Sequence, residues 1–179
     1  MKLTFFGAAK AVTGSSYCLE VNGKKILIDC GLQQGRDERD NRVLDFAPGY
    51  IDYVIVTHAH IDHSGRIPLL VKQGFHGTIV ATRLTGELMS IMLRDSAHIQ
   101  ESDPQWQNQK GRRAGKPIVE PLYTMADAEA AMKLVTTYEY GDTVDLCEGV
   151  RIRFVDAGHL LGSAIVELWL TERDVTRKI

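Results

Sequence analysis

The 179-residue chain is 44% hydrophobic and 25% charged, a balance typical of a globular protein of ordinary domain size with a real core. Its formal net charge of −2 excludes the global basic field that would by itself indicate a nucleic-acid partner. The N-terminus has no long apolar run that would predict a signal peptide, and no stretch reaches the roughly 18 apolar residues of a membrane span. Cys18, Cys30 and Cys147 form no Cys-X-X-Cys pair, which favours buried reduced thiols. We therefore expect a cytoplasmic protein with no membrane partner.

The first half of the chain is predicted to form short strands separated by turns. The predicted strands cover residues 2–6, 16–21, 25–29, 53–57 and 78–81. Asn22 and Gly23 are typical of a two-residue hairpin turn between the second and third strands. The run 53–57 is apolar on both faces, as in the centre of a sheet. A helix over 65–73, with Pro68 in its first turn, is predicted to follow.

The second half is predicted to contain two helices and then strands. The helices cover 84–101 and 125–135, and the strands cover 143–146, 150–155 and 164–170. Thr124 is expected to cap the second helix, and the polar stretch 102–116 is expected to be an exposed loop. The last residues, 171–179, indicate a turn into another strand. We expect an α/β sandwich that is the N-terminal part of a longer protein. The alternative is a small complete domain with a frayed tail.

Four potential metal ligands fall within six residues at the end of the central strand. The segment 58–63 reads His-Ala-His-Ile-Asp-His. Imidazole and carboxylate are suitable zinc ligands, and crowded imidazoles repel one another when protonated. His58 and His60 are expected to point to one side of an extended backbone, whereas Asp62 and His63 lie on the turn into the helix. The spacing favours two adjacent metal ions over one, and the alternative is a chance cluster of solvated histidines.

Other polar residues follow predicted strands or lie near the cluster. His159 would usually be structural on its own, but beside the cluster it is predicted as the third imidazole of the first metal. Asp29 ends an apolar strand and is predicted to orient ligands, with a loop cap as the alternative. Arg66 is predicted either to approach a phosphate or to form an ordinary salt bridge. His76 and His98 have no ligand spacing and are predicted to be ordinary.

The motif His-X-His-X-Asp-His after a strand, with an Asp-Cys-Gly turn before it and a Gly-His-Leu-Leu-Gly-Ser turn after it, resembles the metallo-β-lactamase superfamily. Several further sequence segments resemble those of the superfamily's β-CASP branch, the RNA-processing nucleases related to the cleavage and polyadenylation endonuclease. The matching segments are 6–9 (FGAA), 12–15 (VTGS), 57–66 (THAHIDHSGR), 121–124 (PLYT) and 158–164 (GHLLGSA). Together they span nearly the whole chain, whereas the histidine motif alone indicates only the superfamily.

The resemblance implies the N-terminal portion of an αββα sandwich and a role for each candidate residue. It assigns one zinc to His58, His60 and His159, and a second zinc to Asp62 and His63. Asp29 matches a motif that lies near the metals without binding them, so Asp29 and Asp62 are the candidate catalytic carboxylates. The branch also needs a bridging aspartate beyond Ile179 and an inserted β-CASP domain. We therefore expect two zinc ions in the full-length protein, and one or none in residues 1–179.

Two zinc ions of this kind activate water for attack on phosphorus and neutralise charge on the phosphoryl oxygens. In the branch that the sequence resembles, the outcome is cleavage of RNA phosphodiester bonds. RNA is therefore the expected partner of the full-length protein, and residues 1–179 alone are expected to be inactive. Two alternatives remain: a thioester or lactam hydrolase of the same superfamily, and a catalytically silent scaffold subunit. The sequence leaves a homo-oligomer open.

Overall fold

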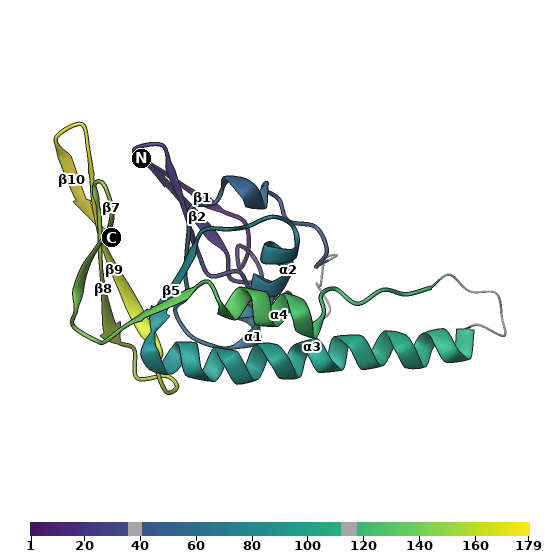
Figure 1. Cartoon of the computed structure of the whole chain (residues 1–179). Helices are drawn as coiled ribbons and strands as arrows, with labels where there is room; N and C mark the ends of the chain where they lie inside the picture. Colours follow the sequence, from purple (N-terminus) through teal and green to yellow (C-terminus); the bar gives the residue numbers. More distant parts are fainter. Residues whose placement is uncertain (36–40, 112–117) are drawn as a thin grey trace.

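The computed structural model describes residues 1–35, 41–111 and 118–179, which form a layer of helices, a first sheet and a second sheet (Figure 1). The first sheet has the order β1-β2-β3-β4-β5-β6 and the second the order β10-β9-β8-β7. The strands of the first sheet are β1 (Lys2–Phe5), β2 (Tyr17–Val21), β3 (Lys24–Ile28), β4 (Tyr53–Ile55), β5 (Thr78–Thr82) and β6 (Val135–Tyr138). The strands of the second are β7 (Thr143–Cys147), β8 (Val150–Asp156), β9 (Ala164–Glu172) and β10 (Val175–Lys178). The predicted α/β sandwich is confirmed.

The central strands of the first sheet are buried on both faces, because their side chains alternate between two hydrophobic cores. From β3 to β6 the strands pair in parallel, the arrangement that brings their carboxyl ends to one edge. Val54 packs in the core beneath the helices, while its neighbour Ile55 packs in the core between the sheets. This alternation has the two-residue period of a strand and confirms that the run after residue 52 is a central strand.

The helices all contribute to the core on the first sheet's outer side. They are α1 (Ile61–Ser64), α2 (Ile67–Lys72), α3 (Arg83–Gly111) and α4 (Met125–Met132), with a 3-10 turn, η1, over Pro48–Tyr50. Met89 and Leu93, one helical turn apart on α3, are fully buried against this core. The predicted cap of α4 is confirmed, since Thr124 forms a reciprocal capping box with Asp127, which satisfies helix N–H groups that would otherwise lack partners.

Three sequence predictions differ from the structure. The stretch expected to be a loop from residue 102 is helical as far as Gly111, and residues 112–117 lie outside the described part. Gln and Lys are good helix formers, so a polar composition does not by itself indicate a loop. The helix expected over 65–73 is the shorter α2, which starts after Arg66, and a separate one-turn helix, α1, precedes it. The helix expected to reach residue 135 ends at Met132, and the β-branched run after it forms β6.

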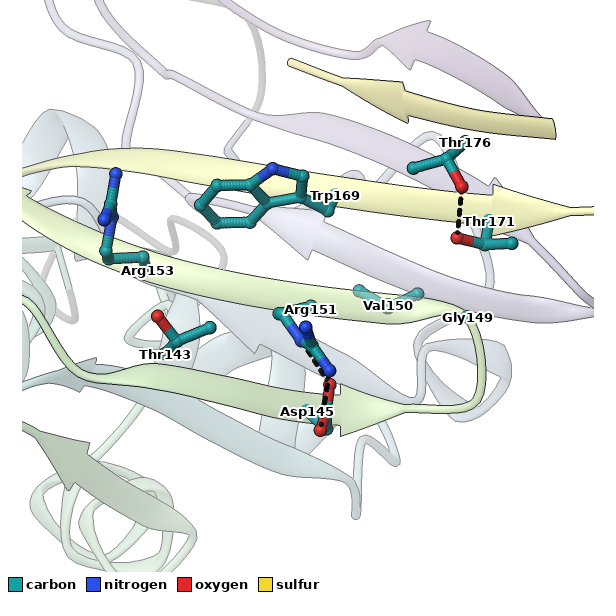
Figure 2. A pocket seen from close by; sticks show the side chains of 9 residues that line it. All are labelled: Thr143, Asp145, Gly149, Val150, Arg151, Arg153, Trp169, Thr171 and Thr176. Atoms are coloured by element: carbon teal, nitrogen blue, oxygen red, sulfur yellow. Dashed lines mark hydrogen bonds and ion pairs between the residues drawn. The ribbon is translucent and has the colours of Figure 1, made fainter.

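The outer face of the second sheet mixes polar side chains with the exposed apolar residues Val155 and Ile165. Figure 2 shows a hollow there, with Arg151 paired to Asp145 and the indole of Trp169 lying near Arg153. The predicted turn into a further strand is confirmed as the β9–β10 hairpin. Cys18 and Cys30 are buried and Cys147 is half-buried, and all three are free thiols. Of the helices in the described ranges, none combines the length and apolarity that a bilayer crossing requires.

The two sheets are held together by apolar side chains, and Phe154 of β8 is among the largest that are fully buried there. We expect Phe154→Ala to lower the free energy of unfolding by about 3–5 kcal/mol, because it leaves a cavity between the sheets. Chemical denaturation measures this loss. The matched control is Phe5→Ala, because Phe5 is 60% exposed, and its effect should be far smaller. Equal losses for the two variants would contradict the importance of the intersheet core.

Candidate metal centre

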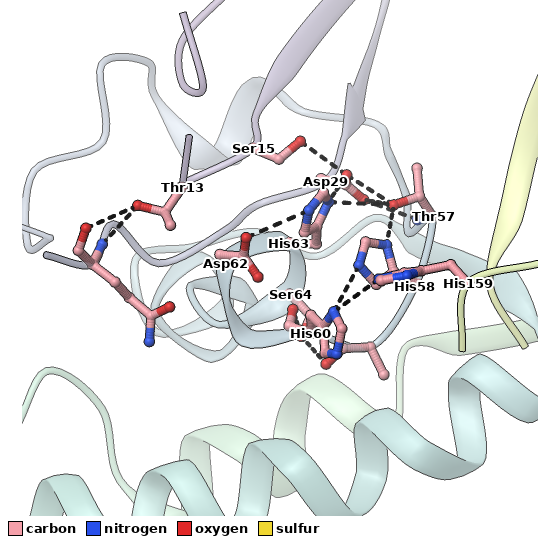
Figure 3. A network of polar contacts seen from close by, with 12 residues as sticks. Thr13, Ser15, Asp29, Thr57, His58, His60, Asp62, His63, Ser64 and His159 are labelled. Carbon is pink, nitrogen blue, oxygen red and sulfur yellow. Dashed lines mark hydrogen bonds and ion pairs between the residues drawn. The ribbon is translucent and has the colours of Figure 1, made fainter. Parts of the chain in front are cut away.

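Three imidazoles from both sheets face one another where the strands end (Figure 3). His58 and His60 follow β4, and His159 lies in the turn between β8 and β9. Nε2 of His58 is 3.2 Å from Nδ1 of His60, and Nε2 of His159 is 3.2 Å from the same His60 nitrogen. The structure thus brings together the three histidines that the sequence predicts as ligands of one metal, although 99 residues separate His60 from His159.

The spacing of these nitrogens fits a shared metal ion. Zinc–nitrogen bonds are about 2.0–2.1 Å in tetrahedral sites, and two ligands on such an ion are then about 3.3 Å apart by geometry. The two measured separations of 3.2 Å match that edge length, and all three ligand atoms lie within 4.8 Å of one another. No other group of three or more His, Cys, Asp or Glu residues in the described ranges meets this criterion.

Asp62 and His63 lie beside this cluster on α1. The Nε2 atom of His63 is 3.6 Å from Oδ2 of Asp62, and the ring centre of His63 is 3.9 Å from that of His58. A carboxylate oxygen and an imidazole nitrogen therefore face a position adjacent to the three-histidine cluster. Their role as ligands of a second ion remains a prediction.

Asp29 occupies the position expected of an orienting carboxylate. One of its oxygens is 2.7 Å from Nδ1 of His63, which leaves the opposite nitrogen of that ring facing Asp62. The Asp29 carboxylate also accepts hydrogen bonds from the Ser15 hydroxyl and from both the backbone N–H and the hydroxyl of Thr57. Such contacts fix the orientation of an imidazole before it binds a metal. Asp29 itself is not part of the three-histidine cluster.

The turn that carries Asp62 and His63 is fastened to the loops around it by backbone hydrogen bonds. Ser15 N–H donates to the carbonyl of Asp62 at 2.8 Å, and Cys30 N–H donates to the carbonyl of His63 at 2.8 Å. Gly31 permits this approach, because a Cβ there would lie 1.6 Å from the Asp62 carbonyl oxygen. The sequence therefore places glycine where the chain after β3 crosses the histidine motif.

Burial and neighbouring charge set the protonation of two of the histidines. Burial, together with the charge of His63, lowers the pKa of His58 to about 4 from its ordinary 6.5, so this ring is neutral at neutral pH and free to bind a cation. Burial also acts to lower the pKa of His63, but the hydrogen bond and charge of Asp29 outweigh it and raise this pKa. A neutral imidazole is the form that binds metal.

Arg66 is placed differently from both of its sequence-based interpretations. Arg66 is 6% exposed and donates to the backbone carbonyls of Gly31 and Val43, and among the described residues it pairs with no carboxylate. His76 and His98 are exposed and lie outside the cluster. Thr57 had no predicted role, and its position directly before the motif was the only signal of its contact with Asp29.

The chain is similar to known proteins in sequence and in fold. A profile described as the metallo-β-lactamase superfamily matches residues 9–150. Ribonuclease TTHA0252 of Thermus thermophilus is 37% identical over 167 residues, which are 93% of this chain and 34% of that protein. Transcription termination factor FttA of Methanocaldococcus jannaschii is 32% identical over 176 residues, 96% of this chain and 25% of the factor. MEM-A1, a subclass B3 metallo-β-lactamase from a soil metagenome library, has the same fold, with a TM-score of 0.57 at 18% identity over 98% of this chain and 58% of its own.

The low pKa of His58 gives the metal-free protein a pH-dependent stability. As the pH falls from 6.5 toward about 4, the unfolded chain binds a proton at this residue and the folded chain does not, so folding free energy is lost over that window. We expect His58→Asn to make the unfolding free energy depend less steeply on pH in that window, by up to about one bound proton. Urea unfolding in chelator at a series of pH values measures the difference. The raised pKa of His63 has the opposite effect on stability, and it is present in both proteins. Parallel curves of unfolding free energy against pH for the two proteins would contradict the lowered pKa of His58.

Proposed function

Since the chain belongs to the metallo-β-lactamase superfamily, we propose that it carries the metal-binding part of a zinc-dependent hydrolase that cleaves RNA phosphodiester bonds. The observation that carries the proposal is the convergence of His58, His60 and His159, with two nitrogen separations of 3.2 Å. Three imidazoles around one point, with an open side, have the donor set of a catalytic rather than a structural zinc site. Zinc in such a site lowers the pKa of a bound water, which makes it a nucleophile at neutral pH.

The candidate residues would have three different roles at this site. His58, His60 and His159 would hold the first ion, and Asp62 and His63 would contribute to a second. Asp29 would keep the ring of His63 turned toward that second position, because it already contacts the ring's other nitrogen at 2.7 Å. The two sites would hold cations against which the negative charge of a phosphodiester is stabilised.

RNA is favoured as the substrate because the similar proteins carry RNA-related names. One is a ribonuclease and another a transcription termination factor, which supports the β-CASP branch. The chain spans about one third of the ribonuclease's length and about one quarter of the factor's, so the activity is proposed for a longer protein that contains this chain. Likeness to β-lactamases at 18% identity concerns the fold and does not favour a lactam. The complete three-histidine cluster speaks against a silent scaffold.

Zinc binding tests the metal part of the proposal directly. We expect residues 1–179 to bind one zinc ion, more weakly than a complete two-metal site, because the second position has only a carboxylate and an imidazole from this chain. His60→Ala should abolish this binding, because His60 contacts both of the other imidazoles. Elemental analysis and calorimetry measure stoichiometry and affinity. His76→Ala is the control, since His76 is exposed and away from the cluster. Two tight zinc sites in the chain alone would contradict the expectation.

RNA cleavage tests the substrate. We expect a longer protein carrying this chain to cleave end-labelled RNA, and His60→Ala in that protein to abolish cleavage by emptying the first site. Residues 1–179 alone should remain at background, because the residues that the structure describes include no evident proton donor for the leaving oxygen, a contribution of about 10²–10⁴-fold in rate. Thioester and lactam substrates, assayed with and without chelator, separate the alternative hydrolase. His60-dependent cleavage of RNA by residues 1–179 would show that the complete site is already present.

A further inference from the structure

The carbonyl of Gly162 attaches the turn that carries His159 to β5 and to the start of α3. We call residues 157–163 the His159 loop. The carbonyl oxygen of Gly162 accepts a hydrogen bond from the hydroxyl of Thr82 at 2.6 Å and another from the hydroxyl of Thr85 at 2.7 Å. Both threonines are buried, with exposed fractions of 2% and 0%. Two buried donors on one carbonyl satisfy both of its lone pairs and fix its position relative to β5 and α3.

Thr82 links this attachment to the start of the long helix. It is the last residue of β5, directly before α3 begins at Arg83. Its hydroxyl oxygen accepts a hydrogen bond from the backbone N–H of Thr85 at 3.2 Å, as a helix-capping side chain does. A hydroxyl has one proton and two lone pairs. The Thr82 hydroxyl therefore accepts from the helix while it donates its proton to the His159 loop.

Glycine is required at the point of contact. Gly162 has a φ of +86°, and a Cβ there would lie 2.4 Å from the backbone nitrogen of Thr85. Within the loop, the hydroxyl oxygen of Ser163 accepts from the backbone N–H groups of His159 and Leu160, at 3.2 Å each. The hydrogen bonds within this turn thus couple the position of Gly162 to the position of the His159 backbone.

The imidazole of His159 has little else to hold it. The residue is exposed, and its side-chain hydrogen bonding is a contact of 3.2 Å with His60, itself exposed. The ring can keep that distance in the absence of metal only if its backbone is fixed. The two threonine hydroxyls join this loop to β5 and to the start of α3, and they act beside two other bonds, from Ala164 N–H to the Thr57 carbonyl and from the Tyr140 hydroxyl to the Ser163 carbonyl.

We propose that Thr82 and Thr85 are positioning residues for the metal centre, which clamp Gly162 so that His159 is held at bonding distance from the ion that His58 and His60 share. This inference rests on the proposed function, because it assumes that the three imidazoles bind a metal. The threonines touch neither the metal nor a substrate, and they act through the backbone of the His159 loop. Partners of this kind contribute about 10–100-fold in metal affinity when they are removed.

The test uses residues 1–179 with Zn²⁺ and Co²⁺ as probes. Thr85→Val removes one hydroxyl and keeps the shape of the side chain, and Thr82→Val/Thr85→Val removes both. Thr85→Ser restores the hydroxyl. Tyr123→Phe is the matched control, because it removes a buried hydroxyl that contacts Ser96, and Ser96 lies 11 residues beyond Thr85 on α3, about 16 Å along the helix. Affinity is measured by competition with a chromogenic chelator, coordination by the Co²⁺ absorption spectrum, and folding by thermal unfolding without metal.

We expect Thr85→Val to weaken zinc binding severalfold and the double variant to weaken it about 10–100-fold, with a Co²⁺ spectrum of altered coordination. Thr85→Ser and Tyr123→Phe should bind as the unmodified chain does. If the valine variants lose thermal stability but keep zinc affinity and the Co²⁺ spectrum, the threonines are merely structural and the inference is wrong. If the double variant does not fold, Thr85→Val against Thr85→Ser decides the question. If the unmodified chain itself binds neither ion, it is the proposed function that fails.

Discussion

The buried carboxylate of Asp29 is the interaction around which the candidate site is built. It is 1% exposed, and a buried charge is costly unless hydrogen bonds and neighbouring charges compensate for it. Its compensation comes from Ser15, from Thr57 and from His63. These partners lie on three different segments, so satisfying one anion fixes the loop before β2, the end of β4 and the helix α1 relative to one another. The same contacts turn His63 toward Asp62.

The metal centre also depends on the packing of the two sheets. His58 and His60 come from the first sheet, and His159 comes from a turn of the second. The apolar side chains between the sheets set the distance between these elements, and hydrogen bonds at the strand ends set their fine position. Ala164 N–H donates to the Thr57 carbonyl at 2.9 Å, and Gly162 is held by the threonines at the start of α3. Folding therefore brings the imidazoles together before any metal is bound, which reduces the cost of ordering ligands on binding.

The electrostatic design of the cluster agrees with this preorganisation. His58 is kept neutral by burial and by its neighbours, so a cation does not have to displace a proton from it at neutral pH. His63 gains affinity for a proton from Asp29, and that same negative charge favours a metal ion nearby. The site thus combines three imidazoles at one position with the carboxylates of Asp29 and Asp62 around the other. This arrangement fits the proposed pair of metal ions.

The sequence by itself determined much of the chain's structure. The hairpin at Asn22 and Gly23, the central strand before the histidine motif and the cap at Thr124 depend on local contacts and alternation, which are written in neighbouring residues. The motif residues His58, His60, Asp62 and His63 were likewise recognisable because their spacing is local. The helix beyond residue 101 was not, because polar helix formers on a solvated helix and polar residues in a loop have similar composition.

Only the tertiary structure decided how distant segments meet. No local pattern indicates that Gly162 must approach Thr82 and Thr85, that Arg66 turns inward to backbone carbonyls, or that the β-branched run after α4 joins the edge of the first sheet as β6. Each of these depends on the packing of elements far apart in the chain, and packing is set by the whole core rather than by neighbouring residues. The sequence identified the ligand candidates, and the fold decided where the backbone of His159 is held, because that position is fixed by contacts 77–80 residues away.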